Sequence, residues 1–531
     1  MNYQKILVLA LALLGRFCNA ANILIVLPYT GKSHYIMLRP IGLELAQRGH
    51  NVTVITPFEE TIHPRNYRQI ISDDVKLWET LGSTSRQNVF SCLDKSMEDM
   101  HKEILWEGGA AITEHALRCK NVQDFLKEDN NFDLVINEVF AQEAFYTLAH
   151  KYNAPQVLIT TYGNSMLTNM LMRNPTQMAT VIYEFAENRH PTSFFGRLLN
   201  LYHTLFVLIY WKFYYLEKQE KLVKKYLTNL PEPVPNLEDI QRNASLVLMN
   251  SHFSFDTPAA YLPNFIEIGG LHVNESSHKS GNLSEDLQKI LHKANNGVVY
   301  VNFGSNIQSS ELPEEKKNAF LKVFKKLKQT VIWKWEDDTL KDLPSNIITR
   351  KWLPQTEILA HPNVKVFVSH GGMLGTQEAI YYGVPIIGIP IYADQYNNLL
   401  HVQEGGYGKI LEYNNLNEKT LEHEINEVLT NKNYAIKAKA MQARFKDRPM
   451  KPLETAIFWI EYVIRNKGAE FIKPPGIKLS WAANNMLDVY TFIIVSILFV
   501  VIIIPKLLLI LLRKLFVRSP ATLPSVIRKN K

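Results

Sequence analysis

The sequence predicts an α/β protein with two consecutive domains, each built around a parallel sheet, followed by one membrane-spanning helix. Three observations support this fold class. Apolar runs of strand length alternate with helical stretches in both halves of the chain. A polar segment at residues 274–285 separates the halves. Near the C-terminus, residues 489–512 are apolar except for Lys506, which is enough to cross about 30 Å of hydrocarbon at about 1.5 Å per residue.

The first half opens with a strand–helix–strand pattern. Residues 23–27 and 52–56 form apolar runs of strand length, and a helical stretch that ends at Arg48-Gly49 joins them. A further helix is expected to end near Tyr152. The remaining strands of this half are predicted at residues 133–137, 156–160, 246–250 and 265–268.

The second half alternates more regularly between strands and helices. Its predicted helices include residues 314–327 and 376–382. This alternation predicts a parallel sheet that is covered by helices on both faces. The strands are predicted at residues 298–303, 331–335, 364–368 and 384–389.

The net charge of +7 comes from the two ends of the chain. Two basic residues precede residue 21 and seven follow Asp488, and neither segment contains an acid. The body between them therefore has a net charge of −2. A nearly neutral body does not indicate a polyanionic partner, so nucleic acid is not expected to bind.

The two ends also predict the cellular location. Residues 1–20 combine Lys5, an apolar run and small residues near the end, as a secretory signal peptide does. A transmembrane helix is predicted at residues 488–512, and the positive-inside rule places the basic tail, residues 513–531, in the cytosol and the body in the lumen. The final Arg-Lys-Asn-Lys is either a dibasic retrieval signal or ordinary juxtamembrane charge. We expect a single-pass type I protein of the endoplasmic reticulum membrane.

A lumenal location bears on the cysteines and on glycosylation. After removal of the signal peptide, which carries Cys18, the chain keeps Cys92 and Cys119, which either form a disulfide or remain two buried thiols. Asn51 begins a predicted strand and is expected to be inaccessible, whereas the sequons in the polar segment are better placed. The four sequons begin at Asn51, Asn243, Asn274 and Asn282.

The most informative segment spans residues 364–395. An apolar strand ends at His370 and two glycines, and a helical stretch follows them. A second apolar strand leads to Asp394 and Gln395. Glycines allow a diphosphate to approach the backbone, and a helix N-terminus offers N–H groups and partial positive charge. Because open parallel sheets bind ligands at the carboxyl ends of their strands, the segment predicts a phosphate site followed by a pair of polyol-binding side chains.

This segment resembles the nucleotide-sugar signature of the UDP-glycosyltransferases. The resemblance to the membrane-anchored animal members, the insect ones included, extends from about Asn22 to the C-terminal tail. It implies a GT-B arrangement in which two Rossmann-like domains face a central cleft. The implied segments are an acceptor-binding domain at 21–285, a UDP-sugar-binding domain at 286–450, and a return helix with a juxtamembrane segment at 451–487. The matching residues are Trp352, Gln355, His370, Gly371, Gly372, Glu378, Pro385, Pro390, Asp394 and Gln395.

The resemblance implies a role for each donor contact. Trp352 stacks on uracil while Gln355 bonds the nucleoside. Ser305 and His370 meet the diphosphate, and protonation would strengthen the contact of His370. The carboxylate of Glu378 suits the ribose hydroxyls. The remaining predicted donor contacts are Gly371, Gly372 and Thr376 near the diphosphate and Asp394 and Gln395 at the sugar.

These donor residues also have structural interpretations. A tryptophan at the end of a strand is commonly a core residue. A Gly-Ser pair after a strand, as at Ser305, is a common turn. An aspartate at the position of Asp394 can cap a helix.

The acceptor base is expected from the first domain. His34 follows the first strand, and an imidazole titrates near neutral pH, as removal of a hydroxyl proton requires. In the family, a histidine at this position is the general base and an acid orients it. The matching acid position holds Glu138, where vertebrate members carry aspartate. Asp133 is the competing choice, at the opposite end of the same predicted strand, and a purely structural His34 is the alternative interpretation.

One residue departs from the family pattern, and one acidic cluster needs an explanation. Many members have asparagine near the diphosphate where this chain has Leu374, which cannot donate a hydrogen bond and leaves donor affinity and sugar choice open. The acidic residues 336–338 follow a predicted strand without other hard ligands nearby. We expect solvated charge there, and therefore neither a metal nor another cofactor besides the UDP-sugar substrate.

The aromatic segment 194–215 has no counterpart in these motifs. Charged residues interrupt it, so it is too short to span a membrane. It is either an interfacial helix, an entrance for the acceptor, or a packed core helix, and the core helix is the preferred prediction.

The predicted function is transfer of a sugar from a UDP-sugar to a hydroxyl of a small lipophilic acceptor, with inversion at the anomeric carbon. We expect UDP-glucose rather than UDP-glucuronate as the donor. One alternative is glycosylation of a membrane lipid such as ceramide. A second alternative is a catalytically silent protein that binds nucleotide sugars, and a homo-oligomer is left open.

Overall fold

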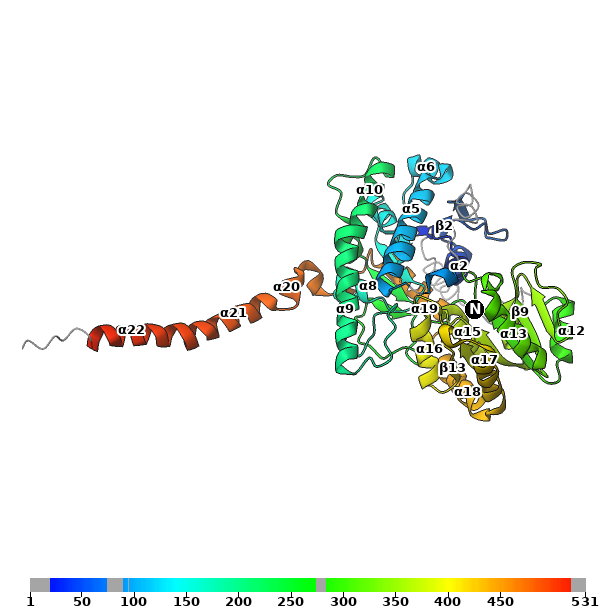
Figure 1. Cartoon of the computed structure of the whole chain (residues 1–531). Coiled ribbons are helices and arrows are strands. Elements are labelled where there is room, and N and C mark those ends of the chain that lie inside the picture. Colours follow the sequence, from blue (N-terminus) through cyan, green and yellow to red (C-terminus); the bar gives the residue numbers. More distant parts are fainter. Residues whose placement is uncertain (1–19, 74–88, 94, 274–282, 517–531) are drawn as a thin grey trace, which may run out of the picture. The chain divides into compact units, whose positions relative to one another are not determined.

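The computed structural model describes residues 20–73, 89–93, 95–273 and 283–516 (Figure 1). The chain forms two compact units, Met1–Lys473 and Pro474–Lys531. The first unit contains two parallel sheets, and the second contains the apolar C-terminal helix.

The first sheet has the strand order β3-β2-β1-β4-β5-β6-β7, and all of its strand pairs are parallel. Its strands are β1 (Asn22–Val26), β2 (Asn51–Thr56), β3 (Tyr67–Ile71), β4 (Leu134–Glu138), β5 (Gln156–Thr160), β6 (Leu246–Met249) and β7 (Phe265–Glu267). The α-helices of this half are α2 (Lys32–Gln47), α4 (Met97–Met100), α5 (Gly108–Arg118), α6 (Lys120–Lys127), α7 (Thr147–Lys151), α8 (Met166–Leu171), α9 (Phe194–Tyr210), α10 (Leu216–Tyr226) and α11 (Leu237–Arg242). Two π-helical turns, η2 (His101–Glu107) and η4 (Trp211–Tyr215), continue neighbouring helices.

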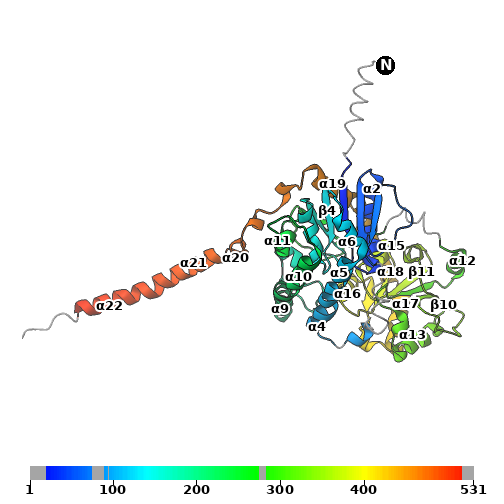
Figure 2. The same ribbon diagram turned by 90° about the horizontal axis from the view of Figure 1, so that it is seen from above.

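The second sheet has the order β10-β9-β8-β11-β12-β13 and is also parallel. Its strands are β8 (Val298–Asn302), β9 (Thr330–Lys334), β10 (Ile347–Arg350), β11 (Val364–Ser369), β12 (Ile386–Gly388) and β13 (Gly408–Ile410). Its helices are α12 (Glu285–Lys293), α13 (Glu314–Lys326), α14 (Gln355–Ala360), α15 (Met373–Tyr382), α16 (Gln395–Glu404), α17 (Glu418–Thr430) and α18 (Lys432–Lys446). Figure 2 shows the two domains side by side in the first unit.

Both faces of each sheet are buried, which explains the apolar runs in the sequence. Along β1, Leu24 and Val26 pack into one core cluster while Ile23 and Ile25 pack into another. The same alternation holds along β8, whose valines and tyrosine divide between two further clusters. A strand with helices on both faces needs apolar residues at every position rather than at every second one. The predicted α/β fold class with parallel sheets is therefore confirmed.

The sequence did not predict three strands, and all three lie at sheet edges. They are β3 at one end of the first sheet and β10 and β13 at the two ends of the second. Edge strands are short and keep polar side chains, as Arg68 in β3 shows. Their hydrophobic periodicity is therefore too weak to identify them.

Helix α19 (Pro452–Arg465) returns the chain from the second domain to the first. Its buried residues, Ala456, Ile457, Ile460 and Val463, have helical spacing and belong to the same core cluster as Ile23 of β1. The return helix implied by the family resemblance thus packs against the first sheet. Eight residues after α19, the first unit ends at Lys473.

The second unit contains one helix that is long and apolar enough to cross a membrane. It runs over 30 residues, Leu487–Phe516, and is made of α21 (Leu487–Leu498), η10 (Phe499–Ile503) and α22 (Ile504–Phe516). The predicted C-terminal span at 488–512 falls within it. The signal peptide and most of the basic tail lie outside the described residues, so they stay predictions.

The structure describes only part of the predicted lumenal features. The buried thiol of Cys119 donates to the carbonyl of Ile71 at 3.3 Å, while the side chain of Cys92 lies outside the described residues. Asn51 is exposed, so the expectation that this sequon is inaccessible is wrong. Asn243 is exposed as well, and the sequons at 274 and 282 lie outside the described residues.

Candidate functional site

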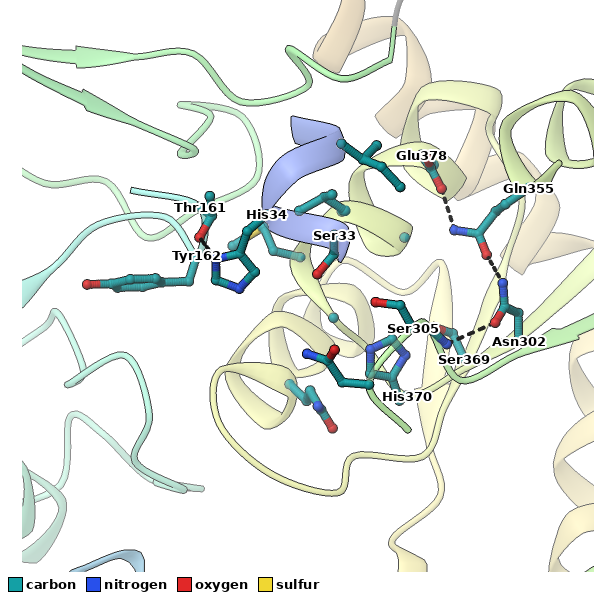
Figure 3. Close-up of a pocket in the computed structure, with 18 of the residues that line it drawn as sticks. Ser33, His34, Thr161, Tyr162, Asn302, Ser305, Gln355, Ser369, His370 and Glu378 are labelled. Carbon is teal, nitrogen blue, oxygen red and sulfur yellow. Dashed lines mark hydrogen bonds between the residues drawn. The ribbon is translucent and has the colours of Figure 1, made fainter. Parts of the chain in front are cut away.

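A cavity of about 530 Å³ lies between the two sheets (Figure 3). Its walls come from the segments that follow β1, β4 and β5 in the first domain and β8, β10, β11 and β12 in the second. In parallel sheets these segments stand at the carboxyl ends of the strands, where ligands bind. Both domains therefore direct their ligand-binding edges at one space.

His34 lies in the first turn of α2 and lines this cavity. Its Nδ1 is hydrogen-bonded to Oε1 of Glu138, the last residue of β4. Thr161 supports the pair, because its Oγ1 lies 2.9 Å from the same nitrogen and donates to Glu138 Oε1 at 3.0 Å (Figure 3). With Nδ1 committed to the carboxylate, Nε2 is the nitrogen left to act in the cavity.

Aromatic rings fix the orientation of this imidazole. Tyr29 and Phe140 each place a ring centroid 4.5 Å from that of His34. Glu138 behind it is 2% exposed, so the carboxylate acts on the cavity through His34. The competing acid, Asp133, lies at the other end of the strand, where its Oδ2 accepts a hydrogen bond from the backbone of Asn22 at 2.8 Å. The structure thus pairs His34 with Glu138 and not with Asp133.

His370 follows β11 on the opposite wall of the cavity. Its ring lies against two glycines, since a Cβ at Gly304 or Gly372 would come within 3.0 Å of the imidazole. Burial, reinforced by the charge of Lys334, lowers the pKa of His370 to about 4. Near neutral pH this lowered pKa favours a neutral imidazole, which can still donate a hydrogen bond.

Two polar atoms on this wall, one of them in His370, are suited to bind a phosphate. Nδ1 of His370 and the hydroxyl of Ser305 are buried and have no hydrogen-bond partner among the described residues. Gly372 caps the N-terminus of α15, where unpaired backbone N–H groups favour anions. Uncompensated buried polar atoms are costly, so an anion that accepts hydrogen bonds fits this wall.

Glu378 lies inside a hydrogen-bond network of the second domain. Gln355 donates to its Oε2, and Thr356 donates to Oε1 at 3.0 Å. Burial raises the pKa of Glu378 to about 7 although these hydrogen bonds favour the charged form. Asn302 extends the network, since its amide donates to Gln355 Oε1 at 2.7 Å (Figure 3).

Trp352 lies after β10 at the rim of the cavity and is 51% exposed. The core interpretation of this tryptophan is therefore wrong. The ammonium of Lys32, from the first domain, lies 3.9 Å from the centroid of the indole. This cation–π contact links α2 to the second domain across the cleft.

Asp394 and Gln395 lie at the start of α16 and line the cavity. Asp394 occupies the N-cap position but makes no side-chain capping hydrogen bond, and its Oδ2 accepts from Asn398 at 2.8 Å. Burial raises the pKa of Asp394 to about 6, against the opposing effects of Asn398 and the nearby His34. The side-chain carbonyl of Gln395 accepts a hydrogen bond from the backbone N–H of Ile391. The nitrogen of the same side-chain amide is left as a donor.

Two of the predicted donor contacts do not face the cavity. Gly371 and Thr376 do not line the cavity, and Thr376 is fully buried within α15. Gly371 has a φ of 87°, which favours glycine and turns the chain between β11 and α15. Leu374 lines the cavity but also packs against the core cluster that includes β1.

A second cavity of about 430 Å³ adjoins the first. The two share Tyr29, Phe140, Phe185, Tyr392 and Ala393 in their linings. Beyond these shared residues the lining is mainly apolar, with Leu93, Met97, Met100, Ile104, Leu105 and Ile112. No sequence motif indicated these residues, because an apolar lining has no required spacing.

Two residues of the site that sequence reasoning missed are Asn302 and Thr161. Each lies at or just beyond the carboxyl end of a strand, Asn302 ending β8 and Thr161 following β5. This position at the carboxyl end of a strand is the feature of the sequence that could have identified them.

The acidic segment after β9 forms local contacts, since Glu336 pairs with Lys334 at 2.6 Å. Within the described residues, no group of three or more His, Cys, Asp or Glu is arranged to hold a metal ion.

Comparisons with known proteins found a family model and relatives that cover most of the chain. A family model described as "UDP-glucoronosyl and UDP-glucosyl transferase" matches residues 22–520. UDP-glucosyltransferase 2 of Dactylopius coccus is 35% identical over 496 residues, covering 93% of each chain. UDP-glucuronosyltransferase 2B15 of Homo sapiens is 28% identical over 503 residues, covering 92% of each. A solved complex of a Polygonum tinctorium UDP-glucosyltransferase matches with a TM-score of 0.57 at 16% identity, covering 84% of this chain and 99% of that one, and shows the same GT-B fold.

Proposed function

The chain belongs to the UDP-glycosyltransferase family, and we propose that it transfers glucose from UDP-glucose to a hydroxyl of a small lipophilic acceptor, with His34 as the general base. One observation carries this proposal. The His34–Glu138 pair of the first domain faces the phosphate-type wall of the second across a single cavity. The two chemical requirements of glycosyl transfer, a base and a place for the leaving diphosphate, thus meet in one space.

The proposed base acts through Nε2. The hydrogen bond to Glu138 keeps the proton on Nδ1, so Nε2 carries the lone pair that takes the acceptor proton. The acceptor oxygen then forms a bond to the anomeric carbon while the bond between that carbon and the UDP oxygen breaks. Glu138 stabilises the imidazolium that results, with Thr161 holding the carboxylate in place. A single displacement of this kind inverts the anomeric configuration.

The leaving UDP takes up negative charge as this bond breaks. The N-terminus of α15, the Ser305 hydroxyl and the neutral His370 imidazole offer hydrogen bonds to its diphosphate. Trp352 supplies an exposed aromatic surface for uracil, and the hydrogen-bonded pair of Glu378 and Gln355 is assigned to the ribose hydroxyls in this proposal. We therefore assign UDP stabilisation to protein groups and propose no metal or further cofactor.

The choice of glucose over glucuronate rests on the cations around the cavity. A glucuronate carboxylate would need an available positive charge. Arg39 is hydrogen-bonded to Glu60, and Lys334 is engaged by Glu336 and by the carbonyl of Gly304. Lys32 does not line the cavity, and its ammonium lies over the indole of Trp352 at the rim. Glucose needs only hydroxyl partners, which Asp394 and Gln395 provide. The identity to a protein named as a glucosyltransferase also supports this choice.

The acceptor is proposed to occupy the adjoining apolar cavity. Its volume of about 430 Å³ lies within the ordinary range of pockets for small molecules. Tyr29 and Phe140 pack against His34 and also line this cavity, so an apolar molecule there can present a hydroxyl to Nε2. A two-chain lipid such as ceramide would have to leave most of its hydrocarbon outside.

The remaining predictions of location are part of this proposal. The apolar helix Leu487–Phe516 anchors the protein in the endoplasmic reticulum membrane, and the catalytic unit lies in the lumen. Protease protection in microsomes tests this orientation. Digestion of the catalytic unit in sealed vesicles would contradict it.

A direct activity assay tests the function. The full-length protein, purified in nanodiscs, would be given UDP-glucose or UDP-glucuronate with a panel of phenols and aliphatic alcohols, and ceramide in competition. We expect UDP release with UDP-glucose, a product heavier by one hexosyl group, and a β-anomeric proton in its NMR spectrum. Transfer from UDP-glucuronate alone, an α-linked product, or hydrolysis without transfer would overturn the proposal.

A further inference from the structure

Helix α9 is amphipathic in the opposite sense from a helix on a water-soluble surface. Its buried face carries the polar residues Asn200, His203 and Thr204. Its exposed face is mainly apolar and continues into η4. The exposed apolar residues are Phe194, Phe195, Leu198, Leu199, Leu201, Tyr202, Leu205, Ile209, Phe213 and Tyr214. We call this set the outer face of α9. The preferred prediction of a packed core helix is wrong for this face.

The buried polar side explains why the helix cannot turn its apolar face inward. Asn200 accepts a hydrogen bond from the backbone of Tyr183 at 2.7 Å and donates to the carbonyls of Met178 and Val181, both at 2.8 Å. Thr204 donates to the carbonyl of Asn200 at 2.8 Å. These bonds hold a long irregular segment and fix the rotation of α9. Because these hydrogen bonds fix the rotation of α9, the outer face remains exposed.

Other surface helices of the same unit show what a water-facing helix looks like here. The exposed positions of α13 are dominated by lysine and glutamate. By contrast, the outer face of α9 exposes 66% of Phe194 and 78% of Phe195. Exposed apolar patches of this extent mark an interaction site rather than ordinary surface.

Contacts along the chain show how close the end of α9 lies to Lys473, where the chain leaves the catalytic unit. Lys212, in the turn directly after α9, pairs with Glu238 of α11 at 2.9 Å. At the other end of that six-residue helix, Asn243 accepts a hydrogen bond from Lys473 at 2.8 Å. Lys473 is the last residue of the catalytic unit. The chain therefore leaves this unit one short helix away from the end of α9.

The segment from there to the apolar helix is short. It runs from Lys473 to Leu487, which limits its span to about 50 Å even when fully extended. Two short helical turns, Pro475–Lys478 and Trp481–Asn484, reduce that span. The covalent tether therefore limits the distance between Lys473 and any bilayer that Leu487–Phe516 crosses to about 50 Å.

We propose that the outer face of α9 and η4 rests in the interface of that bilayer. A helix with aromatic and aliphatic residues on one side binds the headgroup boundary by burying that side, and aromatic residues favour this depth. Arg197 is exposed beside the outer face and can place its charge among the headgroups. The lipid surface is thus the partner of the outer face.

The inner side of the same helix has a second consequence, which rests on the proposed function. His203 of α9 lines the apolar cavity assigned to the acceptor. One helix thus separates the bilayer interface from that cavity. Lipophilic acceptors dissolved in the membrane therefore meet the enzyme at the wall of its acceptor site.

Site-directed fluorescence in the full-length protein tests the contact with lipid. Phe195→Cys and a matched control, Ile436→Cys, would each be introduced with Cys92→Ser, labelled with an environment-sensitive dye, and reconstituted in phosphatidylcholine nanodiscs. Ile436 is a good control because it is an exposed apolar residue of α18 in the second domain. We expect the label at 195 to be blue-shifted and quenched by spin-labelled lipids, and the label at 436 to show neither effect.

Two results would overturn the proposal. Equal exposure of both labels to water would show that no partner covers the outer face. A blue shift at 195 without quenching by lipid would show that protein covers it, either a second copy or residues 474–486. Circular dichroism and UDP binding check that both variants are folded.

A kinetic arm examines the consequence for the acceptor. The triple variant Phe194→Glu, Phe195→Glu, Leu198→Glu is expected to raise KM several-fold for a membrane-partitioning acceptor and to leave KM for a water-soluble phenol unchanged. Ile436→Glu is the control. Equal KM changes for both acceptors would refute the role in acceptor access. If no acceptor is glucosylated at all, the proposed function fails, while the quenching experiment still decides the contact with lipid.

Discussion

His34 and His370 occupy corresponding places in the two domains, and their surroundings give them different chemistry. Each follows a central strand at the carboxyl edge of its sheet, and both line the same cavity. His34 has a carboxylate partner and keeps 14% of its side chain exposed. His370 is enclosed by glycines beside Lys334, and these surroundings lower its pKa to about 4.

The difference shows that the role of a histidine comes from its neighbours. A hydrogen-bonded carboxylate orients the imidazole and stabilises the imidazolium that forms when the ring takes a proton, as the proposed general base must. Burial next to a cation favours the neutral form, which can donate a hydrogen bond but does not take up a proton. Replacement of His34 is therefore expected to impair the proton transfer, and replacement of His370 is expected to impair binding of UDP.

The largest effect is expected for His34→Ala. Loss of the general base should lower kcat for glucosyl transfer by about 10²- to 10⁴-fold. UDP binding should remain, because the nucleotide wall belongs to the other domain. Steady-state UDP release and calorimetric titration with UDP measure the two quantities. Unchanged turnover would remove His34 from the mechanism, and a parallel loss of UDP binding would make its role structural.

Replacing Glu138 by glutamine should have the next largest effect. The amide keeps the size of the side chain but removes the charge that stabilises the imidazolium, so we expect kcat to fall by roughly 10²-fold. The affinity for UDP should stay unchanged, because Glu138 ends β4 in the first domain and lies behind His34. Glu138→Asp, which keeps the charge, is the matched control. A kcat that Glu138→Gln leaves unchanged would mean that Glu138 only fills space behind His34.

His370→Ala should affect donor binding rather than the proton transfer. A hydrogen bond to a charged group contributes about 1.5–3 kcal/mol, so the affinity for UDP should fall by roughly 10- to 150-fold. His370→Gln, which keeps a hydrogen-bond donor, should lose less of the affinity for UDP. Titration calorimetry measures the affinity, and single-turnover rates at saturating UDP-glucose measure the chemical step. A variant with normal affinity and slow chemistry would reverse the contrast between the two histidines.

The position of both histidines followed from the sequence, but the charge state of His370 did not. Glycines and strand ends are local features that a sequence displays. The enclosure of His370 depends on Gly304 and on Lys334 of a different strand, which are brought together only by the fold. The sequence already favoured Glu138 over Asp133 through the family pattern, and the direction of β4 gives the physical reason, because only its last residue reaches His34.

The apolar parts of the site were harder to predict than its polar parts. Met100 and Ile104 line the second cavity from a π-helical region whose sequence carries no functional motif. The outer face of α9 resembled a core helix because composition does not tell which side of a helix is buried. The buried side was decided by the hydrogen bonds of Asn200 to a distant segment.

A smaller effect is expected from pH, through Glu378. Burial raises the pKa of this carboxyl to about 7, so it loses its charge as the pH falls from 8 to 6. The protonated form has one acceptor fewer for ribose hydroxyls, and the affinity for UDP-glucose should therefore decrease several-fold over this range. The lowered pKa of His370 excludes that residue as the cause above about pH 5. Titrations at several pH values measure the effect, and Glu378→Gln should abolish the part above pH 7. Burial raises the pKa of Asp394 to about 6, so this carboxyl accounts for a part that remains at lower pH. A pH dependence above pH 7 that survives Glu378→Gln would assign the effect elsewhere.

The smallest effect is expected for Leu374→Asn, which restores the residue that many relatives carry. An added neutral hydrogen bond to the diphosphate contributes about 0.5–1.5 kcal/mol. The leucine side chain, however, packs against the apolar cluster of the first domain, so the substitution also removes a contact between the domains. These effects oppose each other, and we expect the affinity for UDP-glucose to change by less than about threefold. A tenfold gain would show that backbone N–H groups of α15 do not suffice for the diphosphate, which would shift more of the donor affinity to side chains and weaken the assigned role of His370.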